Sequence, residues 1–366
     1  MFIYRQNSKY RDPLNIIFLC GSKYSVSNPN EKRNVLKRHI ESSIPGCRAL
    51  ILEEHFRFAS TTKSYLSYDD IFLHSLAQIE ELASLFANNI VIIHETVSTA
   101  AELGMFAANP DLTKKICLLS PDDVSIEEKK VSTFIEKAFL VSDSPETMIG
   151  KHIVYYPDVQ VHRESCNKSE YWTSFHNNSI GQELSKSLLS FLHKEENELE
   201  ICFRSPQYGS ANNSSSTIDY HVNKDDNTLA IALRADTLKI LLLALFLHEN
   251  FLINLGVEKP IKDHVTDIEQ SFYMLMHDTI SDLSNLDISN YELNISIKNA
   301  NCSIRQAIGY YLYMLQGIGL IKMEQANSKF PQIRKVLPTA DLELLRKSFP
   351  ELIIERPQTA FGRLMT

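Results

Sequence analysis

The chain has 366 residues, of which 44% are hydrophobic and 22% are charged, and it carries a formal net charge of −8. It is long enough to bury a large core in two or three domains, and its charge excludes a protein that coats nucleic acid with its whole surface. Its six cysteines include no C-x-x-C pair, which argues against a zinc ribbon or a disulfide framework and fits a reducing compartment.

No segment predicts a membrane-bound protein. The N-terminus, MFIYRQNSKYRDP, lacks the apolar stretch of a signal peptide. The most apolar run, Ile240–Leu247, has eight residues, which is too few to span a bilayer and fits a buried helix. We therefore expect a soluble cytoplasmic protein that has no membrane partner.

In the N-terminal part, apolar runs alternate with helical patterns. The runs predict buried strands at residues 15–22, 47–56, 89–95 and 113–120. Helices are predicted between and after them, at residues 30–44, 69–87, 99–109 and 126–141. The inner face of the second helix is predicted to hold Leu73, Leu76, Ile79, Leu82 and Phe86. Continuous apolar strands that alternate with helices are typical of an α/β fold, in which helices cover both faces of a parallel sheet.

The pattern changes after residue 155. A polar stretch leads to a predicted helix at 183–196, and the Gly/Ser/Asn-rich segment 205–220 predicts a mobile loop. Predicted helices follow at 236–255, 267–283 and 303–319, then strands at 320–324 and 332–339 and a last helix at 340–349. Helix, strand, turn and strand is the order of a winged helix. We therefore predict a sheet domain over 1–160, a connecting helix and flexible loop over 161–235, and a helical and winged-helix domain over 236–366.

Ligands of open parallel sheets bind beyond the carboxyl ends of the strands, so the polar residues there are candidates for a site. Cys20, Gly21 and Ser22 follow the first predicted strand, and a glycine lets the backbone approach a ligand closely. Glu53 lies at the end of the second strand. We predict that these four residues contribute to substrate binding.

The third predicted helix begins directly after a strand. Ser98 and Thr99 can cap this helix, and we predict that they also contribute to substrate binding, because the helix N-terminus offers N–H groups and a partial positive charge to an anion. Glu102 follows three residues after Thr99, so it is either a catalytic carboxylate or the acid of a capping box. Several acids at one sheet edge, above a helix dipole and opposite a glycine loop, favour a functional site.

The other candidates also have plain structural explanations. Glu53 can be a solvated turn residue, Glu80 a surface residue of a helix, and His94 a structural histidine. Neither HETVS nor HENFL has a second histidine four residues after the first, so the zinc-protease signature is absent and we expect no metal.

The stretches IFLCGS, LEEHF and NIVIIHETVSTAAELGMF together resemble the nucleoside 2-deoxyribosyltransferase-like fold, a Rossmann-like parallel sheet. More closely, they resemble the effector toxins encoded beside retron reverse transcriptases, which also carry a C-terminal winged helix. The resemblance implies that Glu102 is the catalytic glutamate and that Cys20, Gly21 and Ser22 form the nucleotide loop. Ser98 stands where the family usually has glycine. Glu95 is the nearest acid where the transferases carry an aspartate.

The chemistry that the resemblance implies is cleavage of an N-glycosidic bond. A carboxylate beneath C1′, assigned to Glu102, stabilises or bonds the oxocarbenium-like carbon. A second acid holds the ribose hydroxyls or protonates the leaving base, and its candidates are Glu95, Glu80 and Asp70, in that order. Nicotinamide leaves NAD without needing a proton, so NAD, or another nucleotide, is expected as substrate and not as a cofactor.

The resemblance also implies partners: a retron reverse transcriptase and its multicopy single-stranded DNA, which hold the toxin silent. Residues 301–366 carry nine Lys/Arg and five Asp/Glu, a net charge of +4. We expect the tail to dock this nucleic acid, unless its basic residues form only a solvated rim. The residues concerned are Arg305, Lys322, Lys329, Arg334 and Lys335.

Two other classes of function stay open. The sheet domain can sense a nucleotide without cleaving it, while the winged helix docks nucleic acid or a partner. The chain can also be a transcription regulator, although its net charge of −8 and the modest +4 of its tail disfavour this.

Overall fold

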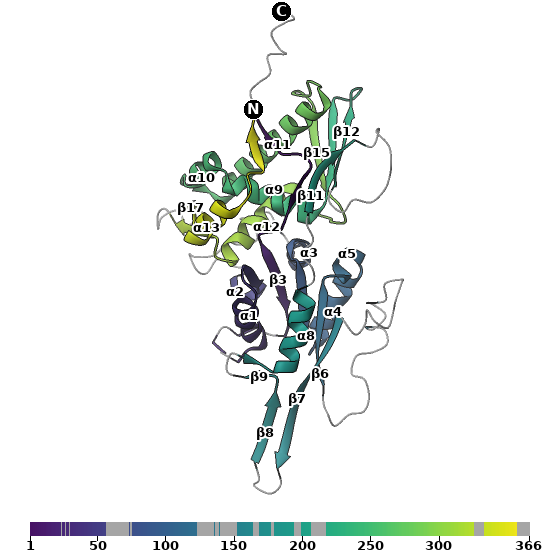
Figure 1. The fold of residues 1–366 in the computed structure, drawn as a ribbon, viewed down its shortest axis with the longest axis vertical. Helices are drawn as coiled ribbons and strands as arrows, with labels where there is room; N and C mark the ends of the chain where they lie inside the picture. The colour runs from purple at the N-terminus through teal and green to yellow at the C-terminus, as the bar shows by residue number, and fades with distance from the viewer. Residues whose placement is uncertain are drawn as a thin grey trace, which may run out of the picture. The chain divides into compact units, whose positions relative to one another are not determined.

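The structure is a computed structural model, and it describes residues 1–22, 24–25, 27–28, 30–55, 73, 75–122, 135, 139, 152–163, 168–176, 179–193, 199–205, 217–325 and 333–356. Its contacts divide the chain into two compact units (Figure 1). The parallel-sheet unit comprises Leu14–Phe56 and Ala83–Glu196. The terminal unit comprises Met1–Pro13, Arg57–Leu82 and Asn197–Thr366.

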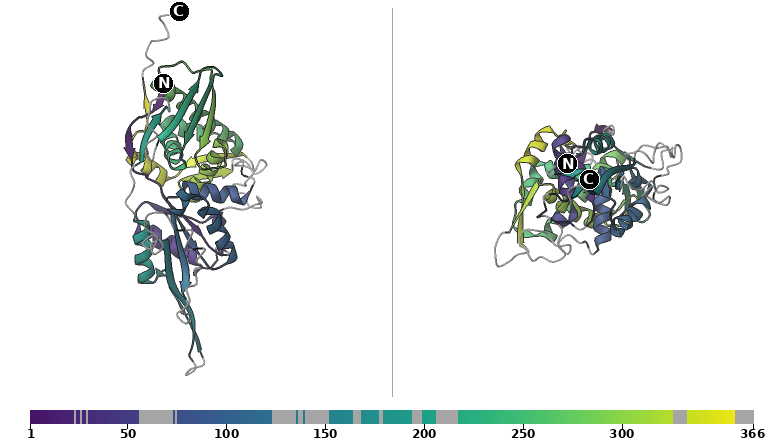
Figure 2. Two further views of the ribbon diagram at one scale, coloured as in Figure 1. Left: turned by 90° about the vertical axis from the view of Figure 1, so that its right-hand side faces the viewer. Right: turned by 90° about the horizontal axis from the view of Figure 1, so that it is seen from below.

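A six-stranded sheet with the order β4-β3-β5-β6-β7-β8 forms the centre of the parallel-sheet unit. The first five strands are parallel, which confirms the predicted α/β class, and β8 pairs antiparallel with β7. The strands are β3 (Asn15–Cys20), β4 (Cys47–Leu50), β5 (Asn89–Ile93), β6 (Ile116–Asp122), β7 (Ile153–Arg163) and β8 (Lys168–Thr173). The second half of β7 pairs only with β8, and Figure 2 shows the two strands continuing as a ribbon.

Helices cover both faces of this sheet, as predicted. Ile17 and Leu19 of β3 pack in one buried cluster with α1 (Lys32–Ser43) and α8 (Gln182–Leu192). Phe18, which points to the opposite face, contacts Phe106 of α4 (Val97–Ala107), with ring centroids 6.1 Å apart. The shorter elements of this unit are α2 (Leu52–His55), α5 (Pro110–Thr113), β9 (Phe175–His176) and β10 (Ser179–Ile180).

Two of the helices predicted in the N-terminal part need comment. Helix α3 spans Leu76–Phe86, and Ile79, Leu82 and Phe86 are buried as predicted. Leu76 is 45% exposed, so its predicted place on the inner face is wrong. The helix predicted at 126–141 lies almost wholly outside the described residues.

The terminal unit contains a five-stranded mixed sheet that the sequence analysis did not predict. Its order is β15-β13-β12-β11-β2, with β11–β12 and β13–β15 parallel. Strand β12 begins at Thr217, so the predicted loop 205–220 is wrong over its last residues. The strands are β2 (Ser8–Tyr10), β11 (Leu199–Arg204), β12 (Thr217–Asn223), β13 (Thr228–Leu233) and β15 (Glu292–Ile297).

The predicted C-terminal helices are present with small differences. The helix predicted at 236–255 is two helices, because His248 adopts an extended backbone conformation between them. The helices are α9 (Ala235–Leu247), α10 (Glu249–Leu255), α11 (Ile261–Ser284), α12 (Ile304–Gly317) and α13 (Ala340–Ser348). Within the described part of the chain, no helix is both long and apolar enough to cross a membrane.

Helix α12 leads into an antiparallel hairpin, as the order of elements predicts. The hairpin strands are β16 (Ile321–Gln325) and β17 (Ile333–Pro338), and β14 (Lys259–Pro260) adds to the other side of β17. Helix α13 follows the hairpin.

The grouping of the chain differs in detail from the predicted ranges. Residues 161–196 belong to the parallel-sheet unit, since β7 crosses residue 160. The N-terminal segment belongs to the terminal unit, because β1 (Phe2–Tyr4) pairs with β18 (Ile353–Glu355) and β2 pairs with β11.

A buried ion pair anchors this N-terminal segment. Lys239, in the middle of α9, is only 2% exposed and pairs with the carboxylate of Asp12, whose side chain is 17% exposed. A buried ammonium group requires such a partner, because leaving it uncompensated in an apolar core costs several kcal/mol.

We predict that Asp12→Ala destabilises the protein by about 3–5 kcal/mol, because Lys239 then stays buried without the Asp12 carboxylate. The double variant Asp12→Ala/Lys239→Met removes both charges and should recover most of the loss. Urea unfolding followed by circular dichroism measures both. Asp219→Ala is the matched control, since it breaks a pair with Lys298 in the same unit whose side chains are 44% and 31% exposed, and it should cost less than about 1 kcal/mol. Equal losses for the two aspartates would contradict the prediction.

Candidate functional site

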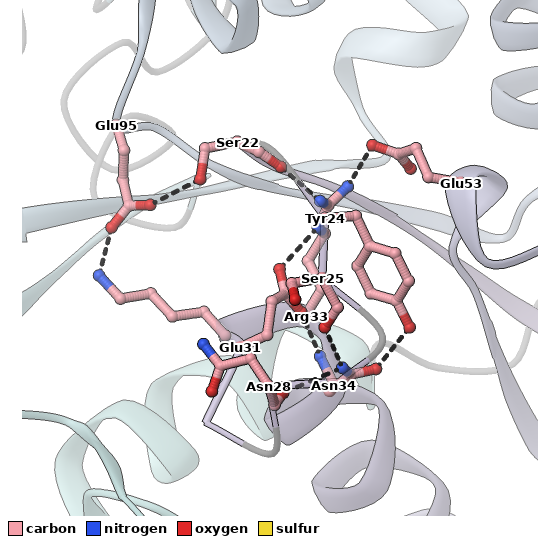
Figure 3. A network of polar contacts seen from close by, with 10 residues as sticks. Ser22, Tyr24, Ser25, Asn28, Glu31, Arg33, Asn34, Glu53 and Glu95 are labelled. Atoms are coloured by element: carbon pink, nitrogen blue, oxygen red, sulfur yellow. Dashed lines mark hydrogen bonds and ion pairs between the residues drawn. The ribbon is translucent and has the colours of Figure 1, made fainter.

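The carboxyl edge of the parallel sheet brings together residues from three strand ends and one residue from within β7. Gly21 and Ser22 follow β3, Glu53 lies on α2 just after β4, and Glu95 follows β5. Tyr156 of β7 reaches the same edge, where its neighbour in the sheet is Pro121 near the end of β6. Figure 3 shows that the polar side chains here form two linked groups, one around Arg33 and one around Glu95.

Arg33 is the centre of the first group. Its side chain is only 1% exposed, and its guanidinium bonds Glu31 Oε1 at 3.1 Å, Glu53 Oε1 at 2.7 Å and the carbonyl oxygen of Ser22. Burial alone would lower the pKa of Arg33, but the carboxylates of Glu53 and Glu31 outweigh burial and raise it. Glu53 is therefore the ion-pair partner of a buried arginine, while its own side chain is 51% exposed.

Gly21 packs directly against the buried side chain of Arg33. A Cβ atom at Gly21 would lie 3.0 Å from Arg33 Cδ and 3.1 Å from Arg33 Nε. The space beside the glycine is therefore filled by the buried arginine, and a larger side chain at this position would press against Arg33. Cys20, directly before the glycine, is buried in the sheet.

The N-terminus of α1 already carries an anionic group. Glu31 is its N-cap residue, and its carboxylate accepts a hydrogen bond of 2.8 Å from the backbone N–H of Asn34. Tyr24 donates to Asn34 Oδ1 at 2.7 Å, and burial together with the nearby Glu54 and Glu31 raises the pKa of Tyr24 to about 12. A ligand anion at this helix would have to displace the Glu31 carboxylate.

Glu95 is the centre of the second group. Its Oε1 atom accepts from Lys32 Nζ and, at 3.2 Å, from the Tyr156 hydroxyl. Its Oε2 atom accepts from Ser22 Oγ at 3.4 Å. The side chain of Glu95 is 23% exposed, so a small molecule at the sheet edge can still reach it.

Helix α4 begins differently from the prediction. Its N-cap is Thr96, whose hydroxyl accepts from Thr99 N at 3.4 Å, while Thr99 Oγ1 accepts from Thr96 N at 3.2 Å. Thr96 and Thr99 thus form the capping box. Ser98 and Glu102 take no part in it, so the explanation of Glu102 as a capping acid is wrong. Thr99 is fully buried and Ser98 is exposed.

Glu102 lies in the second turn of α4, one turn after Ser98 and Thr99, and one of its carboxylate oxygens, Oε2, is shielded from solvent. His94 precedes Glu95 at the end of β5, and burial lowers the pKa of its imidazole. Its Nδ1 atom is also shielded and has no hydrogen-bond partner among the described residues. The β5–α4 connection therefore holds two carboxylates in different surroundings.

The other two acid candidates are not grouped with these residues. Glu80 belongs to the segment of α3 that is part of the terminal unit. Asp70 lies outside the described residues. Among the residues that the structure describes, no three His, Cys, Asp or Glu side chains are close enough to hold a metal ion.

Of the five basic candidates for nucleic-acid binding, four lie in the described part of the chain, and their surroundings differ. Arg334 is 5% exposed, and its carbonyl oxygen bonds His264 Nε2 at 3.1 Å. Arg305 pairs with Glu269 at 2.6 Å and Lys335 with Glu258 at 2.8 Å. Lys322 is exposed.

Lys329, the last of these candidates, lies outside the described residues. The ion pairs of Arg305 and Lys335 arise from acids on other elements of the unit, which the spacing of basic residues along the chain does not reveal.

Four residues that the sequence analysis did not single out complete the two groups: Glu31, Lys32, Arg33 and Tyr156. The sequence contains one signal that could have identified three of them, namely Glu31, Lys32 and Arg33. Lys32 and Arg33 are cations at the start of a helix, where the helix dipole disfavours them unless acids such as Glu31 are close.

The STM3845 retron effector protein family matches residues 29–323, most of the chain. The chain belongs to this family. It is also 27% identical, over 154 residues, to an Escherichia coli protein named "Retron Ec73 putative ribosyltransferase/DNA-binding protein". That alignment covers 41% of this chain and 46% of the relative, so the chain spans about half the length of the curated relative that it matches.

We predict that Gly21→Ala destabilises this effector by about 1–3 kcal/mol, because the added methyl group pushes against a buried arginine held by three partners. Gly104→Ala, on α4, is the matched control: its added Cβ meets no atom within 4 Å. It should be neutral or stabilise the helix by up to about 1 kcal/mol. Urea unfolding of both variants checks this, and an unchanged midpoint for Gly21→Ala would contradict it.

Proposed function

We propose that this retron effector is a toxin of antiphage defence that cleaves the N-glycosidic bond of NAD or another nucleotide. The observation that carries the proposal is the β5–α4 connection at the carboxyl edge of the parallel sheet. There Glu95 is held by three donors, and Glu102 follows with one shielded carboxylate oxygen. Two carboxylates in different surroundings are what glycosidic cleavage uses.

The comparisons support the same class of reaction. The Escherichia coli relative carries ribosyltransferase in its name, and breaking a bond at the anomeric carbon of ribose is the step that ribosyl transfer shares with hydrolysis. The six-stranded sheet, with a helix starting directly after β5, fits the nucleoside deoxyribosyltransferase-like fold that the motifs resemble.

In the proposed reaction with NAD, the bond between C1′ and the pyridinium nitrogen breaks, and its electron pair goes to nicotinamide, which leaves as a neutral molecule. Positive charge develops on C1′ and the ring oxygen, and the Glu102 carboxylate stabilises it. Water then bonds to C1′ and releases a proton to the solvent. Glu95 accepts hydrogen bonds from the ribose hydroxyls.

We further propose that the retron reverse transcriptase and its multicopy single-stranded DNA hold the effector silent through the terminal unit. Helix α12 followed by the β16–β17 hairpin and α13 has the order of a winged helix, a module that often docks nucleic acid. The name of the Escherichia coli relative includes DNA-binding, which supports such a contact. Lys322 is the exposed candidate on this hairpin.

We predict that Glu102→Gln abolishes cleavage of NAD and toxicity while the protein stays folded, because the amide keeps the size of the side chain and removes its charge. The loss should be at least about 100-fold, the size seen when one stabilising group is removed from an active site. Release of nicotinamide, followed by chromatography, measures it for the purified protein with and without its partners.

The matched control is Glu183→Gln, which makes the same change at an exposed acid in the first turn of α8 in the same unit. It should keep full activity. Full activity of Glu102→Gln at equal expression would refute the assignment of the catalytic carboxylate. Binding of NAD without cleavage by the unaltered protein would instead favour a nucleotide sensor.

A further inference from the structure

Lys32 occupies an unusual position for a cation. It is the first residue of α1, where the helix dipole disfavours positive charge, and it is only 18% exposed. Its ammonium group lies 5.1 Å from the ring centroid of Tyr156 and 5.5 Å from that of Phe175. These contacts hold the side chain over the sheet edge.

The two oxygens of the Glu95 carboxylate are used unequally. Oε1 accepts from both Lys32 and the Tyr156 hydroxyl, while Oε2 accepts only the long bond of 3.4 Å from Ser22 among the described residues. A carboxylate oxygen can accept two hydrogen bonds, so Oε2 keeps the capacity to accept another one. Because the ammonium group and the phenol fix Oε1, the direction in which Oε2 points is fixed as well.

Tyr156 makes this arrangement rigid. It is fully buried, and its ring packs edge-on against Phe175 with centroids 5.1 Å apart. Its hydroxyl lies 3.2 Å from both Lys32 Nζ and Glu95 Oε1, which closes a triangle of three polar groups. The Glu95 carboxylate is therefore the point at which β7, the start of α1 and the connection between β5 and α4 meet.

We propose that Lys32 is a positioning residue of this site: it holds Glu95 so that Oε2 accepts a hydroxyl group of the substrate ribose. The inference rests on the proposed function and deepens it. A carboxylate that is paired with an ammonium group acts as an acceptor, which assigns Glu95 to the sugar and not to protonation of the leaving base. The site then suits ribosides with a free 2′-hydroxyl whose base leaves without a proton, and pyridinium ribosides are of this class.

The experiment compares binding of nicotinamide riboside and its 2′-deoxy analogue. Binding is measured by calorimetry in the Glu102→Gln background, which is expected not to cleave either compound. We expect the riboside to bind about tenfold more tightly, the effect of one hydrogen bond to a charged group. Lys32→Met should reduce this ratio to nearly one, and Lys32→Arg, which keeps the charge, should retain most of it.

Lys37→Met is the matched control, because Lys37 lies on the same helix and bonds Glu54, at 2.6 Å, instead of Glu95. It should leave the ratio unchanged. A merely structural role of Lys32 would weaken both ribosides alike, so an unchanged ratio in Lys32→Met would overturn the inference. Failure of both ribosides to bind would overturn it too. The proposed function is judged separately, by cleavage of NAD in the unaltered protein and its loss in Glu102→Gln.

Discussion

The buried guanidinium of Arg33 is the constraint on which the sheet edge depends. A cation that is 1% exposed must be paired, and its partners come from three places: the N-cap Glu31, Glu53 on α2 and the backbone carbonyl of Ser22. The loop after β3, the start of α1 and the chain after β4 are therefore tied to a single side chain. Gly21 is part of the same arrangement, because any Cβ there would occupy the place of the arginine.

A second set of contacts follows from the position of Lys32 directly before Arg33 in the chain. Since Arg33 turns toward Glu53, the preceding residue on the helix turns toward another strand end, where it meets Glu95. Two adjacent cations thus neutralise acids at the ends of β4 and β5, the two strands on either side of β3. The linkage between them runs through Ser22, whose carbonyl oxygen bonds Arg33 and whose hydroxyl bonds Glu95.

The sequence contains the repeating patterns of this fold but not its ion pairs. Continuous apolar strands and amphipathic helices predict the parallel sheet. Strands that are buried on both faces are apolar throughout, and the helices that cover them have one apolar face that repeats with the helical period. The five-stranded sheet was missed, since more buried and more exposed residues alternate along β11, β13 and β15 instead of forming continuous apolar runs, and one edge strand, β2, comes from the distant N-terminus. A local signal did exist at β12–β13, where Asn227 closes the turn in a left-handed conformation. The environment of Glu95 depends on Lys32 and Tyr156, which are 63 and 61 residues away in the chain. The spacing of residues near Glu95 in the sequence does not predict such distant contacts.

The contrast between Glu95 and Glu102 is the feature that connects the fold to chemistry. The two acids are seven residues apart, yet the capping box of Thr96 and Thr99 separates them by turning the chain from strand to helix. Glu95 stays at the strand end, within reach of donors from α1 and β7, whereas Glu102 lies on α4, which covers the opposite face of the sheet from α1. One of the Glu102 oxygens is shielded from solvent, and a carboxylate away from water interacts more strongly with the positive charge that develops in the proposed reaction. One acid is thus fixed by neighbouring donors and the other lies on the following helix, an arrangement that fits the two carboxylates of the proposed glycosidic cleavage.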